Sequence, residues 1–206
     1  MDEKIDGLPT EDLRNLIKSV VLKMGSQFTK EEKKEHARML IKIFEKGMTP
    51  KEVMEITDEE ISQIYSYAYH LFSGGKYLEA RELFKMLVLL EPRQGQFATA
   101  LGVCFHRLKE YDNALSIYML SAILLPSDPV PLFYAYDCFM KLNEPVSAGI
   151  MLCNVISRAG DQKSYAKIKE DAQKLLEELE KQIVGRKNSE ARIQNSEFEI
   201  KVDSSQ

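Results

Sequence analysis

The chain has 206 residues, of which 44% are hydrophobic, and this excludes both a fully disordered protein and a small scaffold held together by disulfides. Its 28 lysines and arginines stand against 32 acidic residues, so the formal net charge is −4 and nucleic acid and anionic lipid are poor candidate partners. Abundant helix-forming residues, with no alternating run that ends in Asn-Gly or Asp-Gly, predict an all-α fold.

The N-terminal residues do not have the composition expected of a targeting signal. It reads MDEKIDGLPTEDL, which is acidic where a signal peptide needs a basic flank and an apolar run. No window of the chain approaches the 18 uninterrupted apolar residues of a membrane-spanning helix. We therefore expect a cytoplasmic protein that does not insert into a membrane.

The first 60 residues do not repeat any other part of the chain and contain two predicted amphipathic helices. Thr10 is a suitable N-cap for the first helix; Thr29 and Glu32 form a capping box that opens the second, which Gly47 closes. The apolar stripes are too large to stay in contact with water, so these helices either pack on the rest of the chain or pair between chains. We favour pairing into a homodimer. The stripes consist of Leu13, Leu16, Ile17, Val20, Val21 and Met24, and of Ala37, Leu40, Ile41 and Phe44.

A period of 34 residues follows. Two copies match well, and a third copy is weaker: it keeps Ala148 and Leu152 but lacks the tyrosine and the terminal proline of the first two. A loss of repeat residues of this kind is typical of a terminal repeat. The period is defined by small, aromatic and proline positions that recur in five pairs: Ala68 and Gly102, Tyr77 and Tyr111, Ala80 and Ala114, Phe84 and Tyr118, and Pro92 and Pro126.

This period is the length of the tetratricopeptide repeat, in which two helices form a hairpin. In each copy the small residues lie where the two helices cross, and the large aromatic residue fills the space beside the crossing. Proline ends the second helix because it has no N–H to donate. The sequence therefore predicts three hairpins, at about 61–94, 95–128 and 129–162, which form a short superhelix over residues 61–162.

The C-terminal part is predicted to contain one more helix. Residues 163–184 are highly charged but keep an apolar seam, which we expect to cover the open end of the last repeat. From 185 to 206 too little apolar surface is left to offset chain entropy, so a disordered tail is expected. The seam consists of Tyr165, Ile168, Ala172, Leu175, Leu176 and Leu179.

Residues that could carry chemistry are few. The three cysteines, among them Cys153, have no CxxC spacing, which indicates a reducing compartment. His70, Cys104 and Cys138 are 34 residues apart, but equivalent positions of stacked repeats lie at least about 8–10 Å apart, too far to share a metal ion. No GxSxG, HExxH, P-loop or GxGxxG motif occurs. The sequence predicts no metal, no cofactor and no enzymatic activity.

The first helices of the hairpins should line a concave groove, into which positions 2, 5, 6, 9, 12 and 13 of each copy point. Counted from Ile61, these positions carry aromatic residues at both ends of the stack, and an apolar patch of this size is typical of a partner-binding site. The predicted partner-binding groove consists of Tyr65, Tyr69, Phe72, Thr99, Val103, His106, Phe133, Tyr134, Asp137 and Met140.

Two segments of the first repeat, IYSYAY from Ile64 and GKYLEARELF from Gly75, resemble the opening repeat of class II chaperones of bacterial type III secretion. These chaperones hold hydrophobic translocator proteins soluble and competent for export. The resemblance covers roughly residues 45–160. It implies a bacterial cytoplasmic chaperone that binds a short extended translocator segment in the groove, with residues 1–60 making dimer or cargo contacts. By position, Tyr65, Tyr69 and Phe72 would form the first apolar pocket, and Val103, His106 and Phe133 would continue its floor.

Two other hypotheses about the function compete with the translocator chaperone. A tetratricopeptide adaptor that clamps a C-terminal carboxylate has Lys and Asn at positions 5 and 9 of the first copy and basic residues at positions 2 and 6 of the third. This chain has Tyr65, Tyr69, Val130 and Tyr134 there, so the clamp is disfavoured. A regulatory scaffold that binds a different protein partner stays open as an alternative.

Overall fold

The computed structural model describes Glu11, Asn15 and residues 29–203, and every regular element in this part of the chain is a helix. The prediction of an all-α fold is confirmed, whereas the helix predicted to begin after Thr10 falls almost entirely outside the described residues. The helices are α2 (Lys30–Lys46), α3 (Pro50–Val53), α4 (Asp58–Ser73), α5 (Tyr77–Leu90), α6 (Gly95–Arg107), α7 (Tyr111–Leu124), α8 (Val130–Lys141), α9 (Pro145–Ala159), a 3-10 turn at Lys163–Tyr165, and α10 (Ala166–Asp203).

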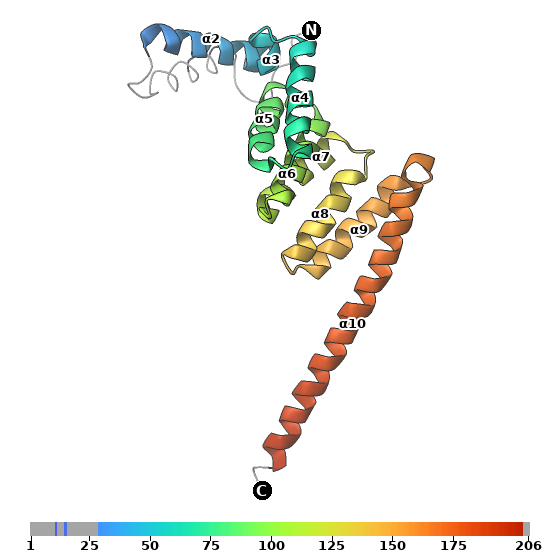
Figure 1. Ribbon diagram of the computed structural model, residues 1–206. Helices are drawn as coiled ribbons and strands as arrows, with labels where there is room; N and C mark the ends of the chain where they lie inside the picture. Colours follow the sequence, from blue (N-terminus) through green and yellow to red (C-terminus); the bar gives the residue numbers. More distant parts are fainter. Residues whose placement is uncertain (1–10, 12–14, 16–28, 204–206) are drawn as a thin grey trace.

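Three helical hairpins, α4–α5, α6–α7 and α8–α9, stack in chain order and form the body of the molecule (Figure 1). Each helix from α4 to α10 packs against the next one along the chain. Helix α2 and the short helix α3 lie at the α4–α5 end of the stack, and α10 lies along α9 at the other end. The first helices of the hairpins, α4, α6 and α8, therefore form one row, and the second helices α5, α7 and α9 form the other.

Capping boxes start the three helices before and at the beginning of the stack. Thr57 Oγ1 accepts a hydrogen bond from the Glu60 N–H at 3.2 Å, and Glu60 Oε2 accepts one from the Thr57 N–H at 2.8 Å. Thr29 with Glu32 and Thr49 with Glu52 form the same reciprocal pair. These bonds satisfy backbone N–H groups that have no partner within the helix, and the capping box predicted at Thr29 and Glu32 is confirmed.

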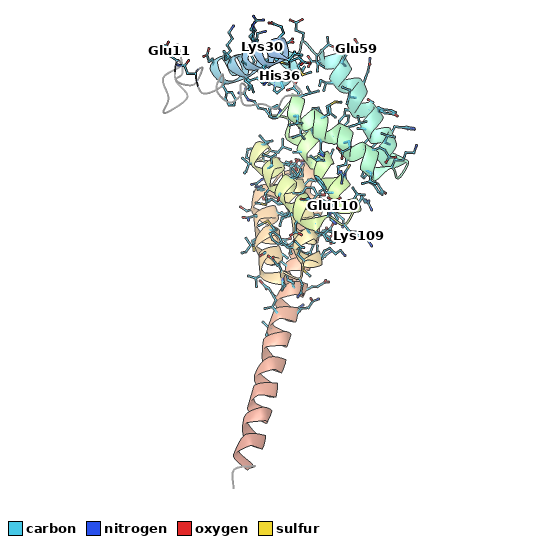
Figure 2. All side chains as sticks on the ribbon, turned by 90° about the vertical axis from the view of Figure 1, so that its left-hand side faces the viewer. Glu11, Lys30, His36, Glu59, Lys109 and Glu110 are labelled. Atoms are coloured by element: carbon cyan, nitrogen blue, oxygen red, sulfur yellow. The ribbon has the colours of Figure 1, made fainter. Side chains whose placement is uncertain are left out.

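The turn inside each hairpin has one residue in the left-handed backbone conformation. The three residues are spaced by the repeat length and have positive φ angles: 77° for Gly75, 62° for Lys109 and 60° for Asn143. Figure 2 shows Lys109 beside Glu110 at the edge of the stack. Only the first of these turns uses glycine, for which the conformation costs no steric strain. The second copy therefore holds a lysine in a conformation that disfavours a side chain.

Replacing Lys109 with glycine is expected to raise the free energy of unfolding by about 1 kcal/mol, because the left-handed strain at this turn is removed. Urea unfolding followed by circular dichroism would measure the change. Lys76→Gly is the matched control, since Lys76 is an exposed turn lysine with a φ of −84°. Its replacement should lower the stability, because glycine has more freedom in the unfolded chain. Equal effects of both substitutions would contradict the strain at Lys109.

A lysine attaches the N-terminal helices to the first repeat. The side chain of Lys51 in α3 is only 13% exposed and forms ion pairs with Asp58, at the start of α4, and with Glu91, at the end of α5, the second at 2.7 Å. Hydrogen bonds to Asp58 and then to Glu91 raise the pKa of Lys51 from 10.5 to about 12. One ammonium group therefore joins α3 to both helices of the first hairpin.

Lys51→Met is expected to release α3 from the stack, because it keeps the apolar stem but removes both ion pairs. Amide hydrogen exchange should become faster in residues 50–56 and stay unchanged in α8 and α9. Because the folded-state pKa is raised, the contribution of Lys51 in the parent protein is complete below pH 10.5 and is lost as the pH rises through about 12. Unchanged exchange in α3 would mean that its apolar contacts hold it in place without the ion pairs.

Two continuous apolar clusters fill the stack. One lies around α4, α5 and α6 and includes Phe84 and Leu87; the other lies around α7 to α10 and includes Tyr118 and Leu152. The small residues of the repeat are buried where helices cross, as predicted: Ala68, Ala80, Ala114 and Ala148 are 0% exposed, and Gly102 is buried as well.

Helix α10 begins at Ala166 and continues to Asp203, past residue 184, where the sequence predicts the helix to end. Its first half buries Ala172 and Leu179 against the second apolar cluster, and its second half projects beyond the stack (Figure 1). The structure thus gives 185–203 as a continuation of α10 rather than as the expected disordered tail. No proline interrupts this segment, and a helix already started by a docked half gains one hydrogen bond with each further residue.

Candidate protein-binding face

The ten residues predicted to form the groove lie on α4, α6 and α8, and we call the sides of these helices that carry them the first-helix face. None of the ten is fully buried. Tyr69 is 58% exposed and Tyr134 is 37% exposed, while the other eight are half-buried. The two most accessible rings therefore stand on the first and the last helix of the row.

The α4 end of the face exposes fewer rings than the sequence predicts. The Tyr65 ring packs edge-on against Phe84, with ring centroids 5.8 Å apart, and lies tilted against Phe97, with centroids 5.6 Å apart. It therefore belongs largely to the contact between the first two hairpins. Phe72 packs against Tyr77 within the first hairpin, with ring centroids 5.2 Å apart. Both rings are half-buried, so Tyr69 is the ring of α4 that this face leaves most accessible.

A second exposed tyrosine on α4 was not among the predicted site residues. Tyr67 is 59% exposed, although the equivalent residues of the next two copies, Leu101 and Ala135, are 3% and 0% exposed. Their helices pack against the second helix of the preceding hairpin, whereas within the described residues only α2 and α3 precede α4. The repeat offset alone could have identified Tyr67 as a residue of the open end of the stack.

In the middle of the face, hydroxyl groups are occupied within the protein. The Thr99 and Ser121 hydroxyls lie 2.6 Å apart, and both are within hydrogen-bonding distance of the Gly95 carbonyl oxygen, at 3.1 and 2.9 Å. Val103 packs against the second apolar cluster. Thr99 thus ties α6 to α7, and this part of the face offers a ligand mainly apolar contact.

A polar network crosses the α8 end of the face. His106 Nε2 lies 2.8 Å from Asp137 Oδ2, which joins α6 to α8. On its other side, His106 Nδ1 makes long contacts with the Tyr118 hydroxyl at 3.5 Å and with Cys138 Sγ at 3.8 Å. The Tyr134 ring stacks on the Tyr118 ring, with ring centroids 5.3 Å apart. The network fixes the Asp137 carboxylate and the Tyr134 ring in place.

The buried members of this network stay uncharged at neutral pH. Burial raises the pKa of Tyr118 far above its ordinary value, and the neighbouring Cys138 adds to the effect. Burial also raises the pKa of Cys138 to about 12, with a further contribution from Asp137, and the pKa of Cys104 to about 12. Neither thiol is therefore a ready nucleophile or metal ligand. Asp137, with 42% of its side chain exposed, can offer an oxygen to a ligand N–H.

Two further predicted residues lie at the edge of the face. The Phe133 ring packs against the Tyr136 ring, with ring centroids 6.1 Å apart. Met140 lines a small pocket between the α8–α9 turn and α10, together with Leu179 and Ile183. Its side chain is therefore shared between the face and the contact with the C-terminal helix.

Within residues 29–185, whose side chains are described, we find no group of three metal-ligating side chains. Of the three residues spaced by the repeat length, His70 is exposed, while Cys104 and Cys138 are buried. No helix in the described part of the chain is both long enough and apolar enough to cross a membrane.

Comparison with known proteins finds similarity to the kind of protein that the sequence resembles. The tetratricopeptide repeat model matches residues 62–92. The low calcium response locus protein H of Yersinia pestis is 26% identical over 125 residues, which cover 61% of this chain and 74% of that protein. The structure of the Yersinia enterocolitica type III secretion translocator chaperone SycD matches with a TM-score of 0.60 and 25% identity, over 63% of this chain and 97% of that one.

SycD has also been solved in complex with a peptide of the translocator YopD, and that structure matches this fold with a TM-score of 0.60 and 24% identity, over 62% of this chain and 98% of that one. The chain is thus similar to translocator chaperones of type III secretion and has their tetratricopeptide fold. The matched part leaves more than a third of this chain uncovered.

Proposed function

We propose that this protein is a bacterial cytoplasmic chaperone of a type III secretion system and that it binds an extended segment of a hydrophobic translocator on the first-helix face. The observation that carries the proposal is the exposure of Tyr69 and Tyr134 at the two ends of a row of helices that matches SycD. Tyrosine, which combines an apolar ring with a polar hydroxyl group, is a typical anchor residue of protein interfaces. A translocator segment would bury both.

The rigidity of the face supports binding of an extended, unfolded segment. Tyr134 is held by stacking on buried Tyr118, and Asp137 is held by His106 at 2.8 Å, so these groups lose little freedom when a partner binds. The exposed oxygen of Asp137 can accept a backbone N–H from an extended chain, which has N–H groups that no internal strand or helix satisfies. Recognition of this kind requires neither a cofactor nor a catalytic residue.

The remaining parts of the chain receive supporting roles in this proposal. Residues 1–60 form an N-terminal extension for dimer or cargo contacts, and Lys51 holds its last helix against the first repeat. Residues 61–162 form the binding scaffold. Residues 163–184 cap the last repeat, because Ala172 and Leu179 fill the apolar cluster that α9 would otherwise leave open.

Coexpression with a translocator from the type III secretion system of the same bacterium tests the proposal. We expect the translocator to pellet when expressed alone and to co-purify in a stable complex with this chain. Titration of the chain with overlapping translocator peptides should then identify one short segment that binds. A translocator that pellets equally with and without this chain would contradict the proposal.

A further inference from the structure

Two cations lie where the first-helix face meets the turns inside the hairpins. Arg107 is the last residue of α6 and Lys141 is the last residue of α8, and they occupy the same position of successive copies, 34 residues apart. Arg107 follows Val103 by one turn of α6, and Lys141 follows Asp137 by one turn of α8. Both cations are therefore on the side of their helices that carries the first-helix face. We call Arg107 and Lys141 the cation pair.

The chain itself does not occupy the cation pair. Both side chains are exposed, and among residues 29–185, whose side chains the structure describes, neither forms an ion pair or a hydrogen bond. Arg81, by contrast, pairs with Glu110 at 2.8 Å and so joins α5 to α7. The negative end of the helix dipole favours a cation at the last residue of a helix. That interaction leaves the outward side of each charged group available to a ligand.

Acidic groups near the cation pair are few and have other partners. Helices α6 and α8 contain one acidic residue, Asp137, whose carboxylate lies 2.8 Å from His106 Nε2. The acids of the adjoining turns, Glu110 and Glu144, precede α7 and α9 and bond to residues of the second helices. Lys109 in the α6–α7 turn adds a third exposed cation (Figure 2). This end of the face therefore has a local excess of positive charge, although the whole chain carries −4.

The cation pair is within reach of a ligand that contacts the apolar part of the face. Tyr134 lies seven residues before Lys141 on α8, which is about 10 Å along the helix axis. An extended chain advances about 3.3 Å per residue. One segment can thus place an apolar side chain on Tyr134 and a carboxylate about three residues away on the cation pair. In the first copy the equivalent position is the uncharged Ser73, so this charge is confined to the second and third copies.

We propose that the cation pair binds an acidic side chain, Asp or Glu, of the cargo segment. This inference rests on the proposed function, because it names a chemical requirement of the ligand on the same face. Arg107 can donate two parallel hydrogen bonds to one carboxylate, and the Lys141 ammonium can donate another. An apolar segment without an acid leaves both cations without a partner and binds more weakly. The cation pair thereby distinguishes the cargo from other apolar segments.

Paired peptides test the requirement for an acid. The translocator segment that binds this chain should contain Asp or Glu, and its replacement by Asn or Gln should raise the dissociation constant about tenfold, because hydrogen bonds to charged groups contribute this much. Acetylated and amidated peptides ensure that a C-terminal carboxylate is not the ligand. Calorimetry with the full chain should also find that about 0.5 M NaCl weakens binding of the acidic peptide and not of its amide counterpart.

Matched variants of the chain test the two residues. Arg107→Gln with Lys141→Gln should weaken binding of the acidic peptide about tenfold and leave binding of the amide peptide unchanged. Arg93→Gln with Lys163→Gln removes the same charge from exposed residues at the opposite edge of the stack and should affect neither peptide. Arg107→Glu with Lys141→Glu should instead prefer a peptide in which lysine replaces the acid. Circular dichroism verifies that all variants keep their helical content.

Three results would overturn the inference and leave the proposed function intact, because peptide still binds in each of them. The binding segment contains no acid, or the amide peptide binds as tightly as the acidic one. In the third, both glutamine double variants weaken binding equally, which assigns the effect to the overall charge of the chain. Failure of every translocator peptide to bind would overturn the proposed function and this inference together.

Discussion

Replacing Gly102 with leucine is expected to lower the free energy of unfolding by about 3 kcal/mol, because the crossing of α6 and α7 has no room for a side chain. A Cβ atom at this position would lie 2.6 Å from Cε1 and 2.7 Å from Cδ1 of Tyr118. That ring is fully buried, stacked on Tyr134 and in contact with His106, so it cannot move aside. Intrinsic helix propensity favours leucine over glycine, so the loss must come from packing.

Gly149→Ala is the matched control for this prediction. Gly149 also lies inside a helix, but a Cβ there would meet Leu179 at an ordinary contact distance of 3.7 Å. The substitution should raise the free energy of unfolding by about 0.5–1 kcal/mol through helix propensity alone. Urea unfolding followed by circular dichroism compares the two variants. A Gly102→Leu protein as stable as the parent would mean that the hairpin can widen at no cost.

The same crossing explains why the fold could be predicted from the sequence. Small residues at 68, 102, 80 and 114 recur at one offset because each hairpin repeats the same close approach between helices, and a period therefore reports packing directly. The turns were less predictable. Lys109 and Asn143 adopt the left-handed conformation that the sequence signals only at Gly75, since the geometry of the stacked hairpin imposes it on whatever residue stands there.

The candidate site was predictable as a face but not as a set of exposed rings. A helical period tells which side of a helix a residue is on, whereas the exposure of its ring depends on the neighbours within reach. Tyr65 has Phe84 and Phe97 within reach and packs against them, while Tyr69, one turn further along, has no ring packed against it among the side chains that the structure describes and stays exposed. The contact between His106 and Asp137 joins two repeats, so no local pattern could indicate it.

Tyr69→Ala combined with Tyr134→Ala is expected to weaken binding of a translocator segment at least thirtyfold while leaving the helical content unchanged. Loss of an aromatic anchor residue from an interface commonly costs about 2 kcal/mol or more, which is a factor of about thirty in the dissociation constant. Tyr69 is 58% exposed, and Tyr134 is 37% exposed and rests on Tyr118 from the outside, so both substitutions leave the residues of the buried core in place. Isothermal titration calorimetry with the binding peptide would measure the change.

Tyr67→Ala is the control that separates the first-helix face from exposed aromatic surface in general. Tyr67 and Tyr69 are on the same helix and are 59% and 58% exposed, but only Tyr69 belongs to the first-helix face. Tyr65 is unsuitable for the test, because its removal would also loosen the contact between the first two hairpins. If Tyr67→Ala weakens peptide binding as much as the double substitution does, the cargo site is the open end of the stack, and the first-helix face is not the binding surface.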